Sequence, residues 1–151
     1  MRSHSAPPDR QTPTLQGTDE KTVHNMIFTL RSLLFGWLPI VAWAALIFVL
    51  SATPNLRFVP DPGLDFIIRK LGHMGVFGIL ALLLWRALEG TTAWRRPLAW
   101  AFALTVLYAA SDEFHQGFVA GRHPSATDVG IDAAGALIAL VAVGLIRSRR
   151  S

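Results

Sequence analysis

Two pairs of polar side chains in this 151-residue chain have the spacing of neighbours on one helix face. Lys70 and His73 are three residues apart, and Glu113 and Gln116 show the same interval. Residues at this interval lie side by side on a helix surface. A histidine or glutamate in such a cluster can accept and release a proton, so His73 and Glu113 are candidate catalytic residues. Lys70, which can hold an anion as a point charge, and Gln116 are candidate substrate-binding residues.

A second polar group follows between residues 122 and 132. Arg122 carries a planar guanidinium that can hold a phosphate through two hydrogen bonds. Ser125 and Asp128 resemble a capping box that opens a helix, with Asp in place of the usual Glu. Asp128 and Asp132 are four residues apart and therefore share a helix face. The predicted substrate-binding set is completed by Arg122, Ser125, Asp128 and Asp132.

No cofactor is identified from these residues. A divalent cation held by Glu113, Asp128 and Asp132 would suit the oxygen ligands that such cations prefer. None of the spacings is a recognised metal signature, so the metal stays unassigned. The chain has no cysteine, which excludes disulfides, thiolate catalysis and cysteine-based zinc sites.

The composition is typical of a membrane protein. Hydrophobic residues make up 52% of the chain and charged residues only 16%, against about 25% charged in ordinary soluble domains. The net charge of +4 comes from arginines that fall between and after apolar runs, without a continuous basic stripe. We therefore expect membrane lipids as partners and no nucleic acid.

The apolar runs predict an all-α fold, a four-helix transmembrane bundle with a disordered N-terminal tail. Residues 1–25 contain almost no large apolar side chain and are predicted to form a disordered cytoplasmic tail. Residues 26–151 form the membrane domain. Its spans are predicted at about 33–51, 66–88, 97–118 and 127–146.

Glycines in two of the spans predict close helix contacts, because small residues let membrane helices approach. They recur every third residue in the second span and also occur in the fourth. The residues are Gly72, Gly75, Gly78, Gly130 and Gly135.

The basic residues predict the orientation. Ten of the 14 Lys and Arg residues lie in loops and tails on the side of the two termini. Only Arg57, Arg69, Lys70 and Arg122 lie on the other side. Since short cytoplasmic loops retain positive charge, both termini are predicted to be cytoplasmic.

The depth of the polar cluster follows from three uncharged stretches, 71–85, 97–111 and 133–146. Each covers about 21–23 Å at a rise of about 1.5 Å per residue, whereas the hydrocarbon core is about 30 Å thick. Short side chains such as Glu113 and Asp132 cannot snorkel to the surface as arginine does. We therefore expect the cluster several ångströms inside the outer leaflet, at the depth where Ser51 closes the first span.

A purely structural interpretation competes with these assignments. Lys70 and Arg122 would then anchor the helices at the membrane surface, His73 would be an interior hydrogen-bonding residue, and Asp128 would only cap its helix. A network in which the acids pair with the two basic residues would explain the cluster without catalysis.

The motifs Lys70-Leu71-Gly72-His73, Asp112 to Gln116 and Gly121 to Asp128 occur in an order that resembles the VanZ-like family of bacterial membrane proteins. The resemblance covers roughly Trp37 to Ile146, and a serine that closes the first helix, here Ser51, belongs to the same pattern.

The chain departs from the family pattern at three positions. Asp132 stands where the family usually has Asn, Ala120 where Pro is common, and Arg69 where Asp often precedes the Lys. The resemblance implies a location in the bacterial cytoplasmic (inner) membrane and an association with low-level resistance to the glycopeptide teicoplanin. It implies no particular reaction.

Two functional hypotheses follow, with the oligomeric state open. In the first, the protein binds a lipid or a lipid-linked envelope precursor at the outer leaflet and so modulates glycopeptide susceptibility, with Arg122 and Lys70 holding a phosphate. In the second, it is a membrane-embedded hydrolase or transferase acting on a lipid-linked phosphate, with His73 or Glu113 as the general base. A proton-coupled transporter is less favoured because the cytoplasmic side of the spans lacks acids.

Overall fold

The computed structural model describes residues 16–54, 57–90, 95–122 and 124–150. These residues form helices joined by loops, and the first helical run is interrupted by one π-helical segment. The elements in chain order are α1 (Gln16–Arg31), η1 (Ser32–Trp37), α2 (Leu38–Ala52), α3 (Pro62–Glu89), α4 (Pro97–Gln116) and α5 (Ala126–Ser148).

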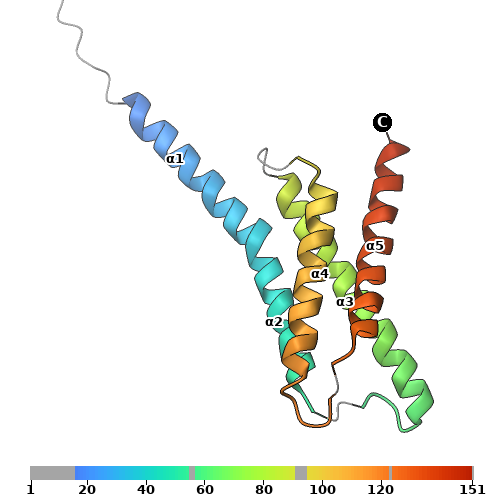
Figure 1. Cartoon of the computed structure of the whole chain (residues 1–151). Coiled ribbons are helices and arrows are strands. Elements are labelled where there is room, and N and C mark those ends of the chain that lie inside the picture. The colour runs from blue at the N-terminus through green and yellow to red at the C-terminus, as the bar shows by residue number, and fades with distance from the viewer. Residues whose placement is uncertain (1–15, 55–56, 91–94, 123, 151) are drawn as a thin grey trace, which may run out of the picture.

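The helices run up and down past one another, and α1 leans away from the bundle (Figure 1). The ends of α2 and α4 lie at the same end of the bundle as the beginnings of α3 and α5, and we call this the site end. The beginning of α1 and the end of α5 lie at the opposite end (Figure 1). This arrangement agrees with a chain whose described ends share one side of a membrane.

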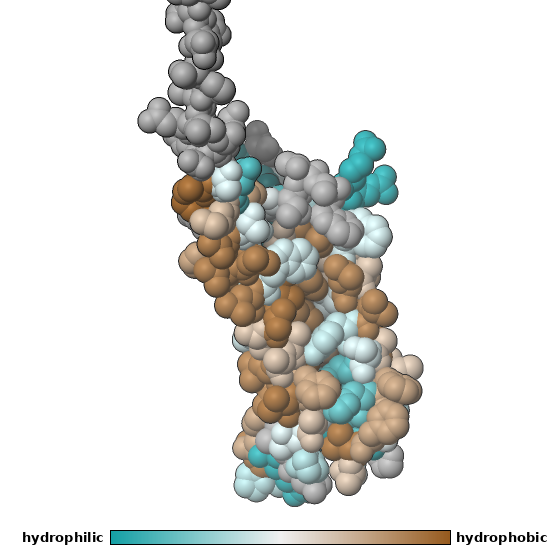
Figure 2. Space-filling view, turned by 90° about the vertical axis from the view of Figure 1, so that its left-hand side faces the viewer, coloured by the Kyte–Doolittle hydropathy of each residue, from teal (hydrophilic) through white to brown (hydrophobic). Residues whose placement is uncertain are grey.

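Three described helical runs are long and apolar enough to cross a membrane: Thr22–Ala52, Pro62–Glu89 and Ala126–Ser148. Apolar side chains cover much of the face seen in Figure 2. On α2, Leu46, Phe48 and Val49 are exposed. The 20-residue α4 contacts both α3 and α5 and returns the chain from one end of the bundle to the other over about 30 Å. The all-α multi-pass fold is therefore confirmed.

The helix boundaries differ from prediction at the start of the chain. Gln16–Asn25, which the sequence assigned to a disordered tail, are helical in the structure, so the prediction was wrong there. Extending an existing helix adds one hydrogen bond per ordered residue, so a polar segment can continue the apolar run behind it at little cost. Residues 1–15 lie outside the described residues.

The other boundaries lie closer to the predicted ones, with the largest shift at α3. This helix begins at Pro62, not at about 66, because the Asp61 side chain caps it by accepting a hydrogen bond from the Leu64 N–H at 2.7 Å. Both signals, a capping Asp followed by Pro in the first turn, are present in the sequence. Helix α4 ends at Gln116 and α5 runs over Ala126–Ser148, close to the predicted 97–118 and 127–146.

The π-helical segment η1 marks the junction of α1 and α2. Pro39 has no N–H, so the Phe35 carbonyl four residues earlier loses its usual helical donor. The Arg86 guanidinium of α3 donates a hydrogen bond to this carbonyl. Arg86 therefore fastens the first membrane helix to the second at the end opposite the site.

The closest helix packing joins α3 to α5. A Cβ added to Gly135 would lie 2.2 Å from the Met74 carbonyl oxygen, and one added to Gly78 would lie 3.2 Å from the Gly135 oxygen. The predicted glycine contacts are thus confirmed at Gly78 and Gly135. They are wrong at Gly72, Gly75 and Gly130, where a Cβ would meet nothing within 4 Å, because residues three apart rotate about 60° around a helix and cannot all face one neighbour.

Candidate functional site

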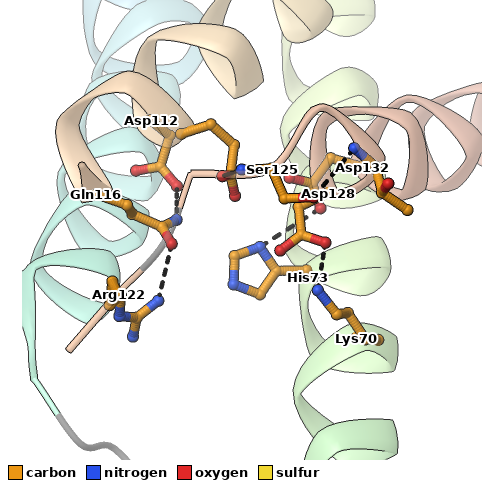
Figure 3. A network of polar contacts seen from close by, with 10 residues as sticks. Lys70, His73, Asp112, Gln116, Arg122, Ser125, Asp128 and Asp132 are labelled. Carbon is orange, nitrogen blue, oxygen red and sulfur yellow. Dashed lines mark hydrogen bonds and ion pairs between the residues drawn. The ribbon is translucent and has the colours of Figure 1, made fainter.

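Buried polar side chains gather at the site end of the bundle (Figure 3). As the sequence analysis predicted, all four helices of the bundle contribute to one level, with α2 supplying Ser51. Placing these polar groups between the helices keeps them away from lipid, where they would be costly. The most deeply buried members, each at most 5% exposed, are Ser51, Asp112, Glu113, Gln116 and Asp132.

Asp112 is the centre of one branch of this cluster. Its Oδ2 atom accepts a hydrogen bond from the Ser51 hydroxyl at 2.7 Å and another from the Gln116 amide at 2.9 Å. The Gln116 carbonyl oxygen in turn accepts one from Arg122 Nη1 at 3.1 Å. A continuous chain of contacts therefore joins the end of α2, the end of α4 and the loop before α5.

Arg122 also docks that loop onto the end of α2. Its Nη2 atom donates to the carbonyls of Leu50 at 3.3 Å and Thr53 at 3.2 Å. The last carbonyls of a helix lack intrahelical donors and carry partial negative charge, so a guanidinium is well suited to them. Gly121 precedes it with a φ of 78°, a left-handed conformation that glycine adopts without strain.

The second branch joins α3 to α5. The Lys70 ammonium forms an ion pair with the Asp128 carboxylate. His73 Nδ1 lies 3.4 Å from Asp132 Oδ1, and Asp132 is 1% exposed. The other ring nitrogen of His73 points away from Asp132, toward the side where Arg122 lies (Figure 3).

Glu113 links α4 to the beginning of α5. Its Oε2 atom accepts a hydrogen bond from the Ser125 backbone N–H at 2.9 Å, and the Ser125 hydroxyl oxygen accepts one from the Thr127 N–H at 3.2 Å. Ser125 is thus the N-cap residue of α5, as predicted. The second half of the capping box comes from Glu113 and not from Asp128, which leaves Asp128 to pair with Lys70.

Several buried oxygens in the cluster have no hydrogen-bond donor within the described part of the chain. They are Asp112 Oδ1, Glu113 Oε1 and both carboxylate oxygens of Asp132. Buried polar atoms are nearly always satisfied, so a ligand or water that brings donors would stabilise this region. Among the described residues, no group of three or more His, Asp or Glu side chains has a metal-binding arrangement, and the divalent cation considered from the sequence gains no support.

Two hollows open beside the cluster. The first, which we call the polar recess, has a volume of about 310 Å³ and is lined by Phe66, Arg69, Lys70, His73, Gln116, Gly121, Arg122 and Asp128. The second, the apolar groove, has a volume of about 240 Å³ and is lined by Ile47, Leu50, Ser51, Phe58, Ile68, Arg69, Gly72, His73, Val76 and Arg122.

The structure distributes the predicted site residues between two positions. Five of them line the polar recess: Lys70, His73, Gln116, Arg122 and Asp128. The remaining three, Glu113, Ser125 and Asp132, contact one another or the recess residues from behind, through the hydrogen bonds and ion pair described above.

Asp112 and Arg69 also belong to the site, although they were not in the predicted set. Asp112 precedes Gln116 by four residues, so its spacing already allowed the contact that it makes. Arg69 lines both hollows and donates from Nε to Asp65 at 2.9 Å, and this pair has the four-residue interval of a helical ion pair. Spacing alone indicated these pairs but did not show which of them face the site.

The comparisons with known proteins agree with this architecture. Residues 8–147 match the family described as VanZ/LLP1. No curated protein and no solved structure matches the chain. The family match covers almost the whole chain, including each membrane helix and the polar cluster, so this multi-pass membrane protein belongs to the VanZ/LLP1 family.

Proposed function

We propose that this protein binds a phosphate-bearing lipid, or a lipid-linked envelope precursor, from the outer leaflet of the bacterial cytoplasmic membrane. The polar recess is the binding site, and the bound lipid is the means by which the protein modulates glycopeptide susceptibility. The single observation that carries the proposal is the charge of the recess, where Arg69, Lys70 and Arg122 face one acid, Asp128.

The charges in the recess favour a phosphate group. Arg122 already donates to Gln116 and to the Leu50 and Thr53 carbonyls. Its positive charge and its remaining N–H donors favour a phosphate, and Lys70 adds a point charge. Asp128 lies in the first turn of α5, where the helix dipole stabilises an anion. Asp128 therefore holds the Lys70 ammonium in position when no ligand is bound, and the ammonium can move from Asp128 to a phosphate that enters the recess.

The distribution of basic residues supports the outer leaflet. Ten Lys and Arg residues lie on the side of the two termini and four on the side of the site. With both termini cytoplasmic, the recess faces outward. The acids beneath it would then lie below the headgroups, where contacts with α3 and α5 shield them from lipid.

Binding is tested with purified full-length protein in detergent, using phosphatidic acid as the phosphate probe and diacylglycerol as the uncharged control. Lys70→Met keeps the apolar stem of the side chain but removes its charge, and Arg122→Gln removes the guanidinium. We expect each variant to bind phosphatidic acid about tenfold to hundredfold more weakly, because a charge-assisted hydrogen bond contributes about 1.5–3 kcal/mol.

Arg57→Gln is the matched control, since Arg57 is exposed at the same end and lines neither hollow. It should bind like the wild type. Unchanged affinity in folded Lys70→Met and Arg122→Gln proteins would refute the proposal. In cells, the same variants should lose an effect on teicoplanin susceptibility while the protein still accumulates in the membrane.

A second candidate function, a hydrolase or transferase acting on a lipid-linked phosphate, is favoured by the His73–Asp132 pair. Asp132 Oδ1 lies 3.4 Å from His73 Nδ1, and the histidine lines the recess, so the ring has a carboxylate beside it, as a histidine general base often has. This function predicts that wild-type protein changes the mass of added lipid phosphate and that His73→Gln binds the lipid but does not change it. If the wild-type protein binds the lipid phosphate without changing its mass, the enzymatic function is refuted and the binding function stands.

A further inference from the structure

The apolar groove runs down from the polar recess between α2 and α3. Three residues, Arg69, His73 and Arg122, line both hollows, so the two lie next to each other. We infer that the groove receives a hydrocarbon chain of the lipid whose phosphate occupies the recess, and that this lipid enters sideways between α2 and α3. The inference rests on the proposed function and adds the part of the ligand that the charges do not specify.

The walls of the groove come from two helices. Ile47 and Leu50 lie on the α2 side, and Ile68 and Val76 on the α3 side. Arg69 and Val76 are seven positions apart, which corresponds to about 10 Å of helix rise. The groove therefore extends from the charged recess well into the depth of the hydrocarbon.

Hydrogen bonds between neighbouring segments define the two ends of the groove. At its floor, the Trp43 indole N–H donates to the Val76 carbonyl at 2.8 Å and bridges α2 to α3. At its mouth, Phe58 lines the opening, and the buried Asp65 carboxylate holds the Phe58 backbone N–H at 2.7 Å. Helices α2 and α3 are thus joined by the Trp43 contact below the groove and by the loop above it. Between these two points the helices lie apart.

A lipid chain suits this space better than water does. Apart from Ser51 and the shared residues at its upper end, the lining is apolar, and water gains few hydrogen bonds there. A phosphate at the surface with a chain directed into the hydrocarbon is the arrangement of any bilayer lipid. Since bilayer lipid is as apolar as the groove, the groove contributes selectivity through fit more than through the hydrophobic effect.

Gly72 provides the means to block the groove. It lines the wall, and a Cβ at this position would meet nothing within 4 Å. A leucine here would project into the open space without displacing the backbone. Gly75, one turn away on the same helix, is equally open but borders a separate hollow with Gly78 and Gly135.

The test compares Gly72→Leu with the matched control Gly75→Leu, using full-length protein and two probes. Dioleoyl phosphatidic acid carries the chains, and glycerol phosphate carries only the headgroup. We expect Gly72→Leu to weaken phosphatidic acid binding about tenfold, to leave glycerol phosphate binding unchanged, and Gly75→Leu to alter neither. Wild-type affinity for phosphatidic acid in Gly72→Leu would overturn the inference.

A second measurement separates this inference from the proposed function. Phosphatidic acid with a photoreactive diazirine in its chain should form adducts at Ile47 and Val76 in wild-type protein, mapped by mass spectrometry, and these should disappear in Gly72→Leu. Adducts confined to the exposed surface of α5, for example at Ile138, would overturn it. If Lys70→Met binds as tightly as the wild type while the groove adducts remain, the phosphate site is refuted and the chain site stands.

Discussion

Replacing Gly135 with alanine tests the close approach of α5 to α3. A Cβ at this position would lie 2.2 Å from the Met74 carbonyl oxygen and 2.7 Å from the Met74 Cα. Both are main-chain atoms, so no change of side-chain conformation can relieve the overlap. Because non-bonded carbon atoms pack at about 3.5–4.0 Å, α3 and α5 would have to separate by roughly 1 Å or more.

The expected loss of stability follows from this overlap. Adding a methyl group to a packed core costs about 1–3 kcal/mol, and a backbone clash belongs at or above the upper end. At about 2–4 °C per kcal/mol for a chain of this size, the melting temperature should fall by roughly 6–12 °C. The separation would also break the contact between His73 Nδ1 and Asp132 Oδ1, which lie 3.4 Å apart in the wild type. His73 is affected because it directly precedes Met74 on α3.

The assay is thermal unfolding of purified protein in detergent, followed by tryptophan fluorescence, together with phosphatidic acid binding at a temperature where the variant is folded. Gly144→Ala is the control, because Gly144 lies on the same helix and a Cβ there would meet nothing within 4 Å. It should change stability by no more than about 1 kcal/mol. A Gly135→Ala protein that melts within about 2 °C of Gly144→Ala, a difference of under about 1 kcal/mol, would refute the close packing of α3 on α5.

Three further predictions concern the site end. Ser51→Ala removes one of two donors to the buried Asp112 carboxylate and should destabilise the protein by about 1.5–3 kcal/mol, measured as a lower melting temperature. Asp65→Ala removes the acceptor of the Phe58 N–H, so this amide should exchange with solvent deuterium faster than in the wild type. Gly63→Cys, placed in a chain without natural cysteine, should react with an impermeant thiol reagent in whole cells, because the proposed orientation exposes it outside.

Each of these predictions has a control that contains the same chemistry elsewhere. Ser111→Ala removes an exposed hydroxyl that donates only within its own helix, so a loss as large as that of Ser51→Ala would contradict the role given to Asp112. Asp61→Ala removes the cap of α3 and should leave exchange at Phe58 slow. Ser148→Cys, at the opposite end, should react only after the cells are permeabilised, and the reverse labelling pattern would invert the topology.

Local sequence features determined the fold class and the level of the polar cluster. A membrane requires long uncharged helices whose backbone groups are satisfied internally, and this requirement is visible directly in hydropathy. The short uncharged stretches likewise placed Glu113 and Asp132 below the helix ends, where both are buried. The cap at Ser125 was also readable because it depends on neighbours in the chain. The start of the first helix could not be predicted in this way, since a polar segment there continues the apolar helix that follows it in the chain.

Only the tertiary structure decided which partner each polar group takes. Asp112 and Glu113 are adjacent and point about 100° apart on α4, so one contacts Ser51 of α2 and the other contacts Ser125 before α5. Helical spacing places both near the core but does not say which neighbouring helix each one meets. That depends on the rotation and separation of helices, which the close contact at Gly135 sets for α3 and α5. The distance between α2 and α3 is likewise a tertiary feature. These helices lie apart at Gly72, and the apolar groove opens there, which no spacing in the sequence indicated.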